Sequence, residues 1–224
     1  MQHHALSERR ELSRTLRRSG PDSATLCGDW TTAQLTAHLV LRERSLAEAA
    51  GRLPVARFKR TAEQVVDDLA RSEPYQQLVD LFERGPSWRD VIGPVPVAWL
   101  WSVPIVREQA NLLEYLVHHE DVRRAEPGWE PRDMPIAFQQ AVWQRLHLLS
   151  RLTLRAVPVG LTMSWPTGGQ IRNRTAKRGG ATVTVTGEPV ELAMFAFGRL
   201  DQARVDLDGS PADIVAVRGA DISL

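Results

Sequence analysis

The stretch Asn111-Leu-Leu-Glu-Tyr-Leu-Val-His-His-Glu-Asp121 decides how this chain of 224 residues is organised. Glu114 and His118 are four residues apart, and on a helix such residues lie one turn above each other, with Cβ atoms about 5–6 Å apart. A carboxylate and an imidazole at that spacing can reach the same metal ion. The candidate for a third ligand is His38, within a second strongly helical segment from Thr31 to Ala50. Two histidines and one carboxylate form a set that holds a catalytic metal and leaves a position open for water or substrate.

The helical projection of the first segment leaves two interpretations open. At about 100° per residue, Glu114, His118 and their polar neighbours project on the side opposite the apolar stripe. Such a face can be solvated, or it can line an internal cleft. The absence of a lysine partner for its Glu, His and Asp residues favours the cleft. The polar residues of this face are Arg107, Asn111, Glu114, His118 and Asp121.

The segment from Thr31 to Ala50 carries two polar residues beside its apolar stripe. His38 lies at the edge of the stripe, where a histidine is more often a structural residue than a metal ligand. Arg42 projects into the middle of the stripe, and burying an unpaired guanidinium is costly. Either this side chain reaches solvent, or it pairs with a buried anion such as Glu114, Asp121 or a bound ligand. We favour the pairing.

Capping and turn signals predict that residues 1–157 form a helical domain with intervening loops. Thr31-Thr-Ala-Gln34 has the form of a capping box at the start of its helix. Asp133 is the expected N-cap of a later helix. Four principal helices are expected over residues 6–18, 31–50, 104–124 and 135–156. They favour an antiparallel four-helix bundle.

Residues 158–224 are predicted to form a small α+β domain with a short antiparallel sheet. Residues 159–165 and 170–175 flank the turn-forming run Pro166–Gly169 and predict a hairpin. Residues 181–186 alternate threonine with small apolar residues, which is the period of a half-buried strand. The last expected elements are a helix, a strand and a helix, over residues 189–197, 204–207 and 211–217. The chain is therefore predicted to be mostly α, with this domain appended.

Composition excludes several classes of partner. The formal net charge of +1 argues against nucleic acid and against an anionic membrane surface. No apolar run approaches the roughly 18 residues of a membrane span. The single cysteine, Cys27, excludes an internal disulfide and fits a reducing compartment. Its expected role is that of a small buried apolar side chain. We therefore expect a cytoplasmic protein.

Several strings of the chain carry a resemblance to a known family. Cys27-Gly-Asp-Trp-Thr-Thr-Ala-Gln-Leu-Thr-Ala-His38-Leu, followed by Glu114-Tyr-Leu-Val-His118-His-Glu-Asp121, resembles the mycothiol-dependent maleylpyruvate isomerase family. That family belongs to the DinB-like metal-binding four-helix bundles. Residues 183–199 are similar to the small domain that follows the bundle in those isomerases. The strings at 41–44 and 117–124 resemble an actinobacterial branch of metal-binding proteins.

The resemblance implies a metal site and a thiol cosubstrate. The family's ligands fall on His38, Glu114 and His118. The family metal is usually zinc, although this ligand set also accepts nickel or iron. Mycothiol, a small-molecule thiol, is the implied cosubstrate. Asp121 is implied as an outer-shell group, and Asn111 is assigned to the same shell.

Arg199 matches an arginine that, in those isomerases, is thought to meet the carboxylates of the substrate. Arg199 and Arg42 are therefore the candidates for catalytic side chains beside the metal. In the mechanism that the resemblance implies, a metal-held thiolate adds to an electrophilic carbon. Isomerisation or group transfer then follows.

Two functional classes remain open. The first is a metal- and thiol-dependent isomerase or S-transferase that acts on a small electrophile. The second is a metal-binding protein without catalysis, with a structural, sensing or partner-binding role. The aromatic, proline-rich stretch Trp88–Pro104 is predicted either to be a subunit contact in a homodimer or to be a lid over the site.

Overall fold

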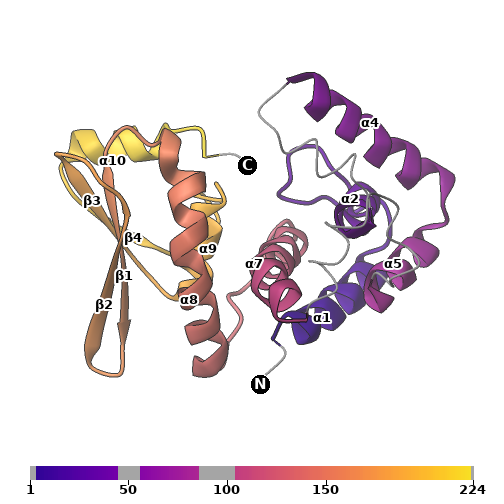
Figure 1. Ribbon diagram of the computed structural model, residues 1–224, viewed down its shortest axis with the longest axis horizontal. Helices are drawn as coiled ribbons and strands as arrows, with labels where there is room; N and C mark the ends of the chain where they lie inside the picture. The colour runs from indigo at the N-terminus through magenta and orange to yellow at the C-terminus, as the bar shows by residue number, and fades with distance from the viewer. Residues whose placement is uncertain (1–3, 45–55, 86–103, 223–224) are drawn as a thin grey trace. The chain divides into compact units, whose positions relative to one another are not determined.

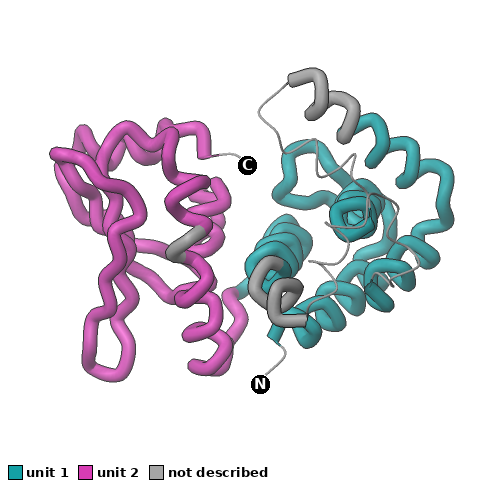
Figure 2. The backbone as a smooth tube through the Cα atoms, in the orientation of Figure 1, with its two compact units in different colours: residues 1–130 teal, residues 131–224 magenta. Residues whose placement is uncertain are grey.

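The computed structural model describes residues 4–44, 56–85 and 104–222 (Figure 1). It confirms a mostly helical chain with an α+β part near the C-terminus. The chain divides into two compact units, residues 1–130 and residues 131–224 (Figure 2). The residues of the Trp88–Pro104 stretch before Pro104 lie outside the described residues, so the predicted homodimer contact or lid stays a prediction.

The first unit is a group of packed helices. In it, α1 (His4–Ser19) lies against α5 (Tyr75–Arg84) and α7 (Pro104–Arg123), while α2 (Thr32–Arg44) lies against α4 (Ala56–Ser72) and α5. The predicted extension of α2 to Ala50 falls outside the described residues. None of the described helices is long and apolar enough to cross a membrane.

Leucines spaced four residues apart build the contact between α1 and α7. Leu12 and Leu16 of α1 are fully buried, as are Leu112 and Leu116 of α7. This spacing puts one apolar stripe of each helix toward the core. Burial of each leucine side chain contributes about 1.5–3 kcal/mol to folding. Because the apolar stripe of α7 faces the core, the opposite, polar face of this helix is the one that carries the candidate ligands.

Buried polar contacts tie α7 to α1 and α2. The guanidinium of Arg9 in α1 donates hydrogen bonds to Glu43 of α2 and to the hydroxyl of Tyr115 in α7. Burial, and then the negative charge of Glu43, raise the pKa of Tyr115 above its ordinary range. One turn along α7, His119 Nδ1 lies 2.7 Å from Glu8 Oε1 of α1. These contacts fix the relative placement of the helices that carry the candidate ligands.

The two predicted helix starts have different outcomes. The Thr31 backbone N–H donates to Gln34 Oε1 at 2.9 Å, as expected of a capping box. The amide nitrogen of Gln34 also donates to Asp67 Oδ1 of α4 at 2.8 Å, so the cap joins two helices. The prediction for Asp133 was wrong. Pro135 occupies the N-cap position of the next helix, and among the described residues no side chain caps it, because Asp133 lies two residues too early.

That helix, α8 (Ile136–Thr153), belongs to the second unit. It packs against α9 (Pro189–Ala196) and against the sheet, and a short 3₁₀ turn (Leu154–Ala156) follows it. Sequence analysis counted this helix as the fourth member of the bundle and placed the boundary after residue 157. By compactness the chain divides between Glu130 and Pro131, and within the second unit α8 contacts α9 and the sheet.

The sheet of the second unit is mixed, with strand order β2-β1-β3-β4. β1 (Gly160–Thr167) pairs antiparallel with β2 (Gln170–Lys177), which confirms the hairpin. β3 (Thr182–Thr186) pairs antiparallel with β4 (Asp206–Asp208). The β1–β3 pair is parallel, so the prediction of a purely antiparallel sheet was wrong at this pair. A last helix, α10 (Pro211–Arg218), contacts β3.

Two glycines explain the parallel pair. After β2 the chain crosses the start of β1, where the Gly160 N–H donates to the Ala181 carbonyl at 2.8 Å. A Cβ atom on Gly179 would lie 2.5 Å from the backbone nitrogen of Gly160, closer than real Cβ contacts allow. Only glycine permits this crossing, which carries β3 to the far side of β1. The hydrophobic alternation of β3 gives no information about strand direction.

Candidate metal centre

The structure brings His38, Glu114 and His118 together in the first unit. One ligand atom from each residue lies within 4.8 Å of the ligand atoms of the other two. His118 Nε2 is 3.5 Å from Glu114 Oε2. Ligand atoms bound to a tetrahedral zinc at about 2.0–2.1 Å stand roughly 3.4 Å apart. The donor set therefore fits a single divalent cation with small side-chain adjustments.

The two helices present these ligands from opposite sides. Glu114 and His118 come from successive turns of α7, and His38 comes from α2. The His38 ring stands edge-on to the His118 ring, with centroids 5.4 Å apart and planes at 75°. On its other side the His38 ring lies 5.3 Å from the ring of Trp30. Leu39, next to His38 in sequence, is fully buried and anchors this part of α2 in the core.

Asp121 contacts Nδ1 of the His118 ring, the nitrogen that does not face Glu114. Its Oδ2 lies 3.0 Å from His118 Nδ1, and its side chain is fully buried. Burial of the imidazole opposes its protonation, but hydrogen bonds to Asp121, Cys27 and Glu114 outweigh burial and raise the pKa of His118 well above its ordinary value. A carboxylate on one ring nitrogen orients the opposite nitrogen toward a metal and increases its basicity.

Arg42 stands behind Glu114. Its side chain is only 4 % exposed, and its Nε lies 3.3 Å from Glu114 Oε2. One terminal nitrogen of the guanidinium donates to Asn111 Oδ1 at 2.7 Å. Of the alternatives that the sequence left open, the structure thus shows pairing with a partly buried carboxylate. Asn111 thus contacts the guanidinium that pairs with Glu114, and its assignment to the outer shell stays a prediction.

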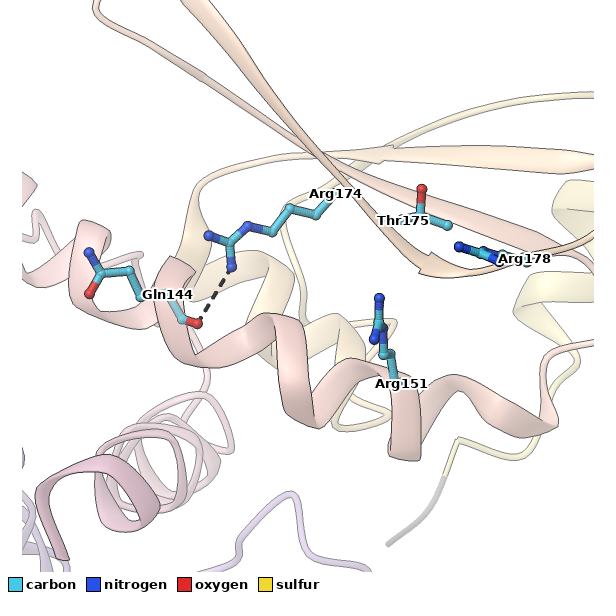
Figure 3. A pocket seen from close by; sticks show the side chains of 5 residues that line it. All are labelled: Gln144, Arg151, Arg174, Thr175 and Arg178. Carbon is cyan, nitrogen blue, oxygen red and sulfur yellow. Dashed lines mark hydrogen bonds between the residues drawn. The ribbon is translucent and has the colours of Figure 1, made fainter. Parts of the chain in front are cut away.

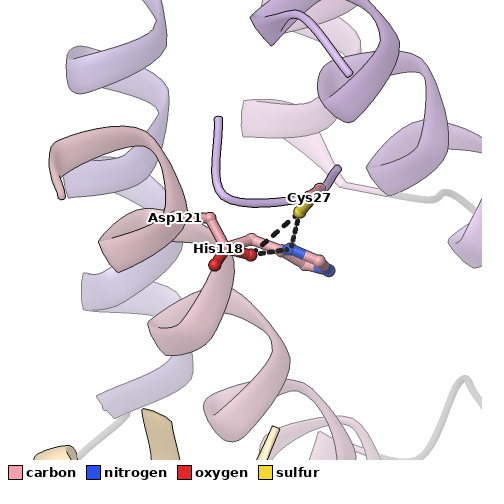
Figure 4. A group of neighbouring side chains, drawn as sticks. All are labelled: Cys27, His118 and Asp121. Atoms are coloured by element: carbon pink, nitrogen blue, oxygen red, sulfur yellow. Dashed lines mark hydrogen bonds and ion pairs between the residues drawn. The ribbon is translucent and has the colours of Figure 1, made fainter. Parts of the chain in front are cut away.

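Cys27 is the residue of this site that sequence reasoning missed. Figure 4 shows its sulfur beside His118 and Asp121. The thiol donates to Asp121 Oδ2 at 2.9 Å, and Sγ lies 3.6 Å from His118 Nδ1. The expected role of a purely apolar side chain was therefore wrong. Cys27, His118 and Asp121 form a second group whose ligand atoms lie within 4.8 Å of one another.

Tertiary contacts place the Cys27 loop. The Leu26 N–H donates to the backbone carbonyl of Asp121 at 3.1 Å, which docks the loop on the end of α7. Within the loop, the Thr25 hydroxyl donates to the Trp30 carbonyl at 2.8 Å. Cys27 and Asp121 are 94 residues apart in sequence, and no local spacing pattern links them. Only the fold reveals their contact.

Arg199 lies in the second unit, three residues after the end of α9. Its backbone N–H donates to the Met194 carbonyl at 3.0 Å, and its guanidinium donates to the Phe197 carbonyl at 2.5 Å. These contacts fix the turn that ends α9. The predicted contact between Arg199 and a substrate stays a prediction.

Comparison with known proteins gives the family. A family model described as the mycothiol maleylpyruvate isomerase N-terminal domain matches residues 3–123, more than half of the chain. The chain belongs to this family. The match covers all five residues of the two overlapping donor groups, so the candidate metal centre lies wholly within the family's domain. A search of curated proteins gave no significant match.

Two crystal structures are similar over nearly the whole chain. One is the mycothiol-dependent maleylpyruvate isomerase with a histidine-to-alanine mutation, at 16% identity and a TM-score of 0.61. The other is the same kind of enzyme without that mutation, at 17% identity and a TM-score of 0.55. Each alignment covers 92% of this chain and 91% of the other. At these identities the likeness establishes a shared fold.

Proposed function

We propose that the chain is a metal- and thiol-dependent isomerase or S-transferase that acts on a small electrophile. The proposed ligands of the metal are His38, Glu114 and His118, and zinc is the first candidate ion. The observation that carries the proposal is the convergence of three donor atoms from two helices within 4.8 Å. Family membership and the fold shared with two mycothiol-dependent isomerases support the choice of chemistry.

The contacts of His118 favour this ligand set over the group that contains Cys27. The ring has two nitrogens: Nδ1 faces Asp121 and Nε2 faces Glu114. A carboxylate–histidine pair is the usual support of a metal-binding imidazole, with the metal on the nitrogen away from the carboxylate. We therefore assign Asp121 and Cys27 to the supporting side of the ring.

A divalent cation, when bound, lowers the pKa of a coordinated thiol and favours the thiolate. The protein's part is to set the charge and the geometry of the site. Two neutral imidazoles and one carboxylate leave a divalent ion with one net positive charge, which attracts an anionic sulfur. Arg42 holds the Glu114 carboxylate in place through its 3.3 Å contact, so we assign it a positioning role.

The source of the thiol is proposed to be external. The chain's own thiol, Cys27, donates to the buried carboxylate of Asp121 at 2.9 Å and is thereby occupied. Mycothiol is the proposed cosubstrate, and Arg199 is proposed to bind an acidic group of the electrophile. Replacing Arg199 with glutamine should raise the KM for an acidic substrate and leave the metal content unchanged.

The first test of this proposal is the metal content of the purified protein. His38→Ala and His118→Ala should each lose stoichiometric zinc, because two remaining ligands hold zinc weakly. His4→Ala, which removes an imidazole from the start of α1, is the matched control and should retain it. Undiminished zinc in either site variant would reject the ligand assignment.

The second test is turnover. Zinc-loaded protein is incubated with mycothiol and a panel of small electrophiles that includes maleylpyruvate, and products are separated by chromatography. Product should form only when both thiol and metal are present, and removal of the metal by a chelator should abolish it. Stoichiometric zinc without turnover of any electrophile would instead favour a metal-binding protein without catalysis.

A further inference from the structure

A hollow in the second unit is lined by arginines and lies outside the candidate metal centre. It has a volume of about 550 Å³ and lies between α8 and β2, with Gln144, Arg151, Arg174, Thr175 and Arg178 around it (Figure 3). Pockets for small molecules commonly have volumes of about 300–1,000 Å³. The described lining holds three positive charges and no carboxylate.

Figure 3 shows how the three guanidinium groups are arranged. Arg151 extends from α8 toward β2. Arg174 extends from β2, and Arg178 is the residue that directly follows this strand. The positive groups therefore come from two separate elements and face a common space. An anion in that space could be bound from both sides.

Arg174 is held in place by its own contacts. One of its terminal nitrogens donates to the Trp143 carbonyl at 2.9 Å, and the guanidinium lies 4.9 Å from the centre of the Trp143 ring. Burial, and then the neighbouring charge of Arg172, lower the pKa of Arg174. A preorganised guanidinium loses little conformational freedom when it binds an anion.

The charge of these arginines is not balanced locally. In the first unit, arginines such as Arg17, Arg71 and Arg123 form ion pairs with carboxylates. Within the part of the chain that the structure describes, no carboxylate pairs with Arg151, Arg174 or Arg178, and the described lining of the hollow contains no acidic residue. Like charges gathered around one space raise the local positive potential and attract anions.

We propose that this arginine-lined hollow is a binding site for a small organic dianion, carrying either a phosphate group or two carboxylates. The guanidinium fork matches both groups, because it can donate two parallel hydrogen bonds to a pair of oxygens. A small anion is favoured over nucleic acid because the arginines converge on one hollow and the chain as a whole carries a formal charge of only +1. This inference does not depend on the proposed function.

Calorimetric titration of the full chain tests the site. Inorganic phosphate and succinate are the two probes, each titrated at low salt and at physiological salt. At least one of them should bind with a stoichiometry of one. Binding of phosphate alone identifies a phosphate site, binding of succinate alone identifies a dicarboxylate site, and binding of both supports recognition of dianions in general.

The double variant Arg151→Gln, Arg178→Gln removes two of the three charges and should weaken binding at least tenfold. Both side chains are exposed, so the variant is expected to fold, and the single variant Arg178→Gln gives a second, smaller loss. Arg218→Gln, an exposed arginine of α10 outside the lining, is the matched control and should bind as the wild type does. Zinc content should be the same in all of these variants.

Two outcomes would overturn the proposal. One is the absence of binding of both anions to the wild type. The other is binding by the double variant that equals binding by the Arg218→Gln control, which would mean that the anion is attracted by general surface charge or binds at the metal.

Discussion

Replacing Asp121 with asparagine should weaken zinc binding without removing a proposed ligand. The change keeps the size of a side chain that is fully buried, and its amide oxygen can still accept from His118 Nδ1. What is lost is the negative charge 3.0 Å from the ring, which makes the imidazole a stronger donor and fixes its tautomer. The thiol of Cys27, which donates to the same oxygen, also loses a charged acceptor.

The expected size of the effect follows from that geometry. Loss of an outer-shell carboxylate typically weakens metal affinity about 10–100-fold, which corresponds to about 1.4–2.7 kcal/mol. The complete burial of Asp121 puts the expectation in the upper half of that range, because charge-assisted hydrogen bonds are stronger away from water.

The assay is a competition titration of zinc against a chromophoric chelator, with circular dichroism to show that the fold is intact. Asp68→Asn is the matched control, because it makes the same chemical change at a side chain that is 77% exposed and pairs with Arg71 on the surface. Its zinc affinity should equal that of the wild type. A folded Asp121→Asn protein with a zinc Kd within about twofold of the wild type would refute the supporting role of this carboxylate.

Three further predictions concern the stability of the fold, the release of a proton on zinc binding, and the role of Cys27. Arg9→Met should lower the free energy of unfolding, measured in urea, by about 3–5 kcal/mol, because it leaves the buried Glu43 charge uncompensated. Arg14→Met removes an exposed ion pair with Glu11 and should cost less than about 1 kcal/mol in the same assay. Because hydrogen bonds raise the pKa of His118, zinc must displace a proton from it, so calorimetry in different buffers should show release of about one proton and zinc affinity should rise with pH. Cys27→Ser should keep zinc affinity within about threefold, because a serine hydroxyl can still donate to Asp121 Oδ2. A larger loss would make Cys27 a ligand.

The part of the site built on helical spacing could be predicted from sequence. Glu114 and His118 face the same side of α7 because residues four apart always do so on a helix. His38 was a weaker candidate, and its approach to His118 depends on how α1, α2 and α5 pack, which no local pattern encodes. The capping box at Thr31 was predictable because all of its atoms belong to one helix turn.

The features that could not be predicted depend on contacts between distant segments. Cys27 reaches Asp121 only because the Leu26 N–H docks on the end of α7. The direction of β3 depends on a crossing at Gly160 and Gly179, and the alternation of its side chains is the same in either direction. The contacts of α8 with α9 and the sheet could not be predicted either, because an amphipathic helix shows that it packs against something without showing what covers it.

X-ray absorption spectroscopy of the zinc-loaded protein, recorded before and after addition of mycothiol, tests the central assignment most directly. The account predicts only nitrogen and oxygen ligands at about 2.0–2.1 Å in the protein alone, from His38, Glu114 and His118, and one added sulfur at about 2.3 Å with the thiol. A sulfur ligand in the protein without added thiol would place the ion at Cys27 and contradict the account. Failure of mycothiol to add a sulfur would contradict the proposed thiol chemistry.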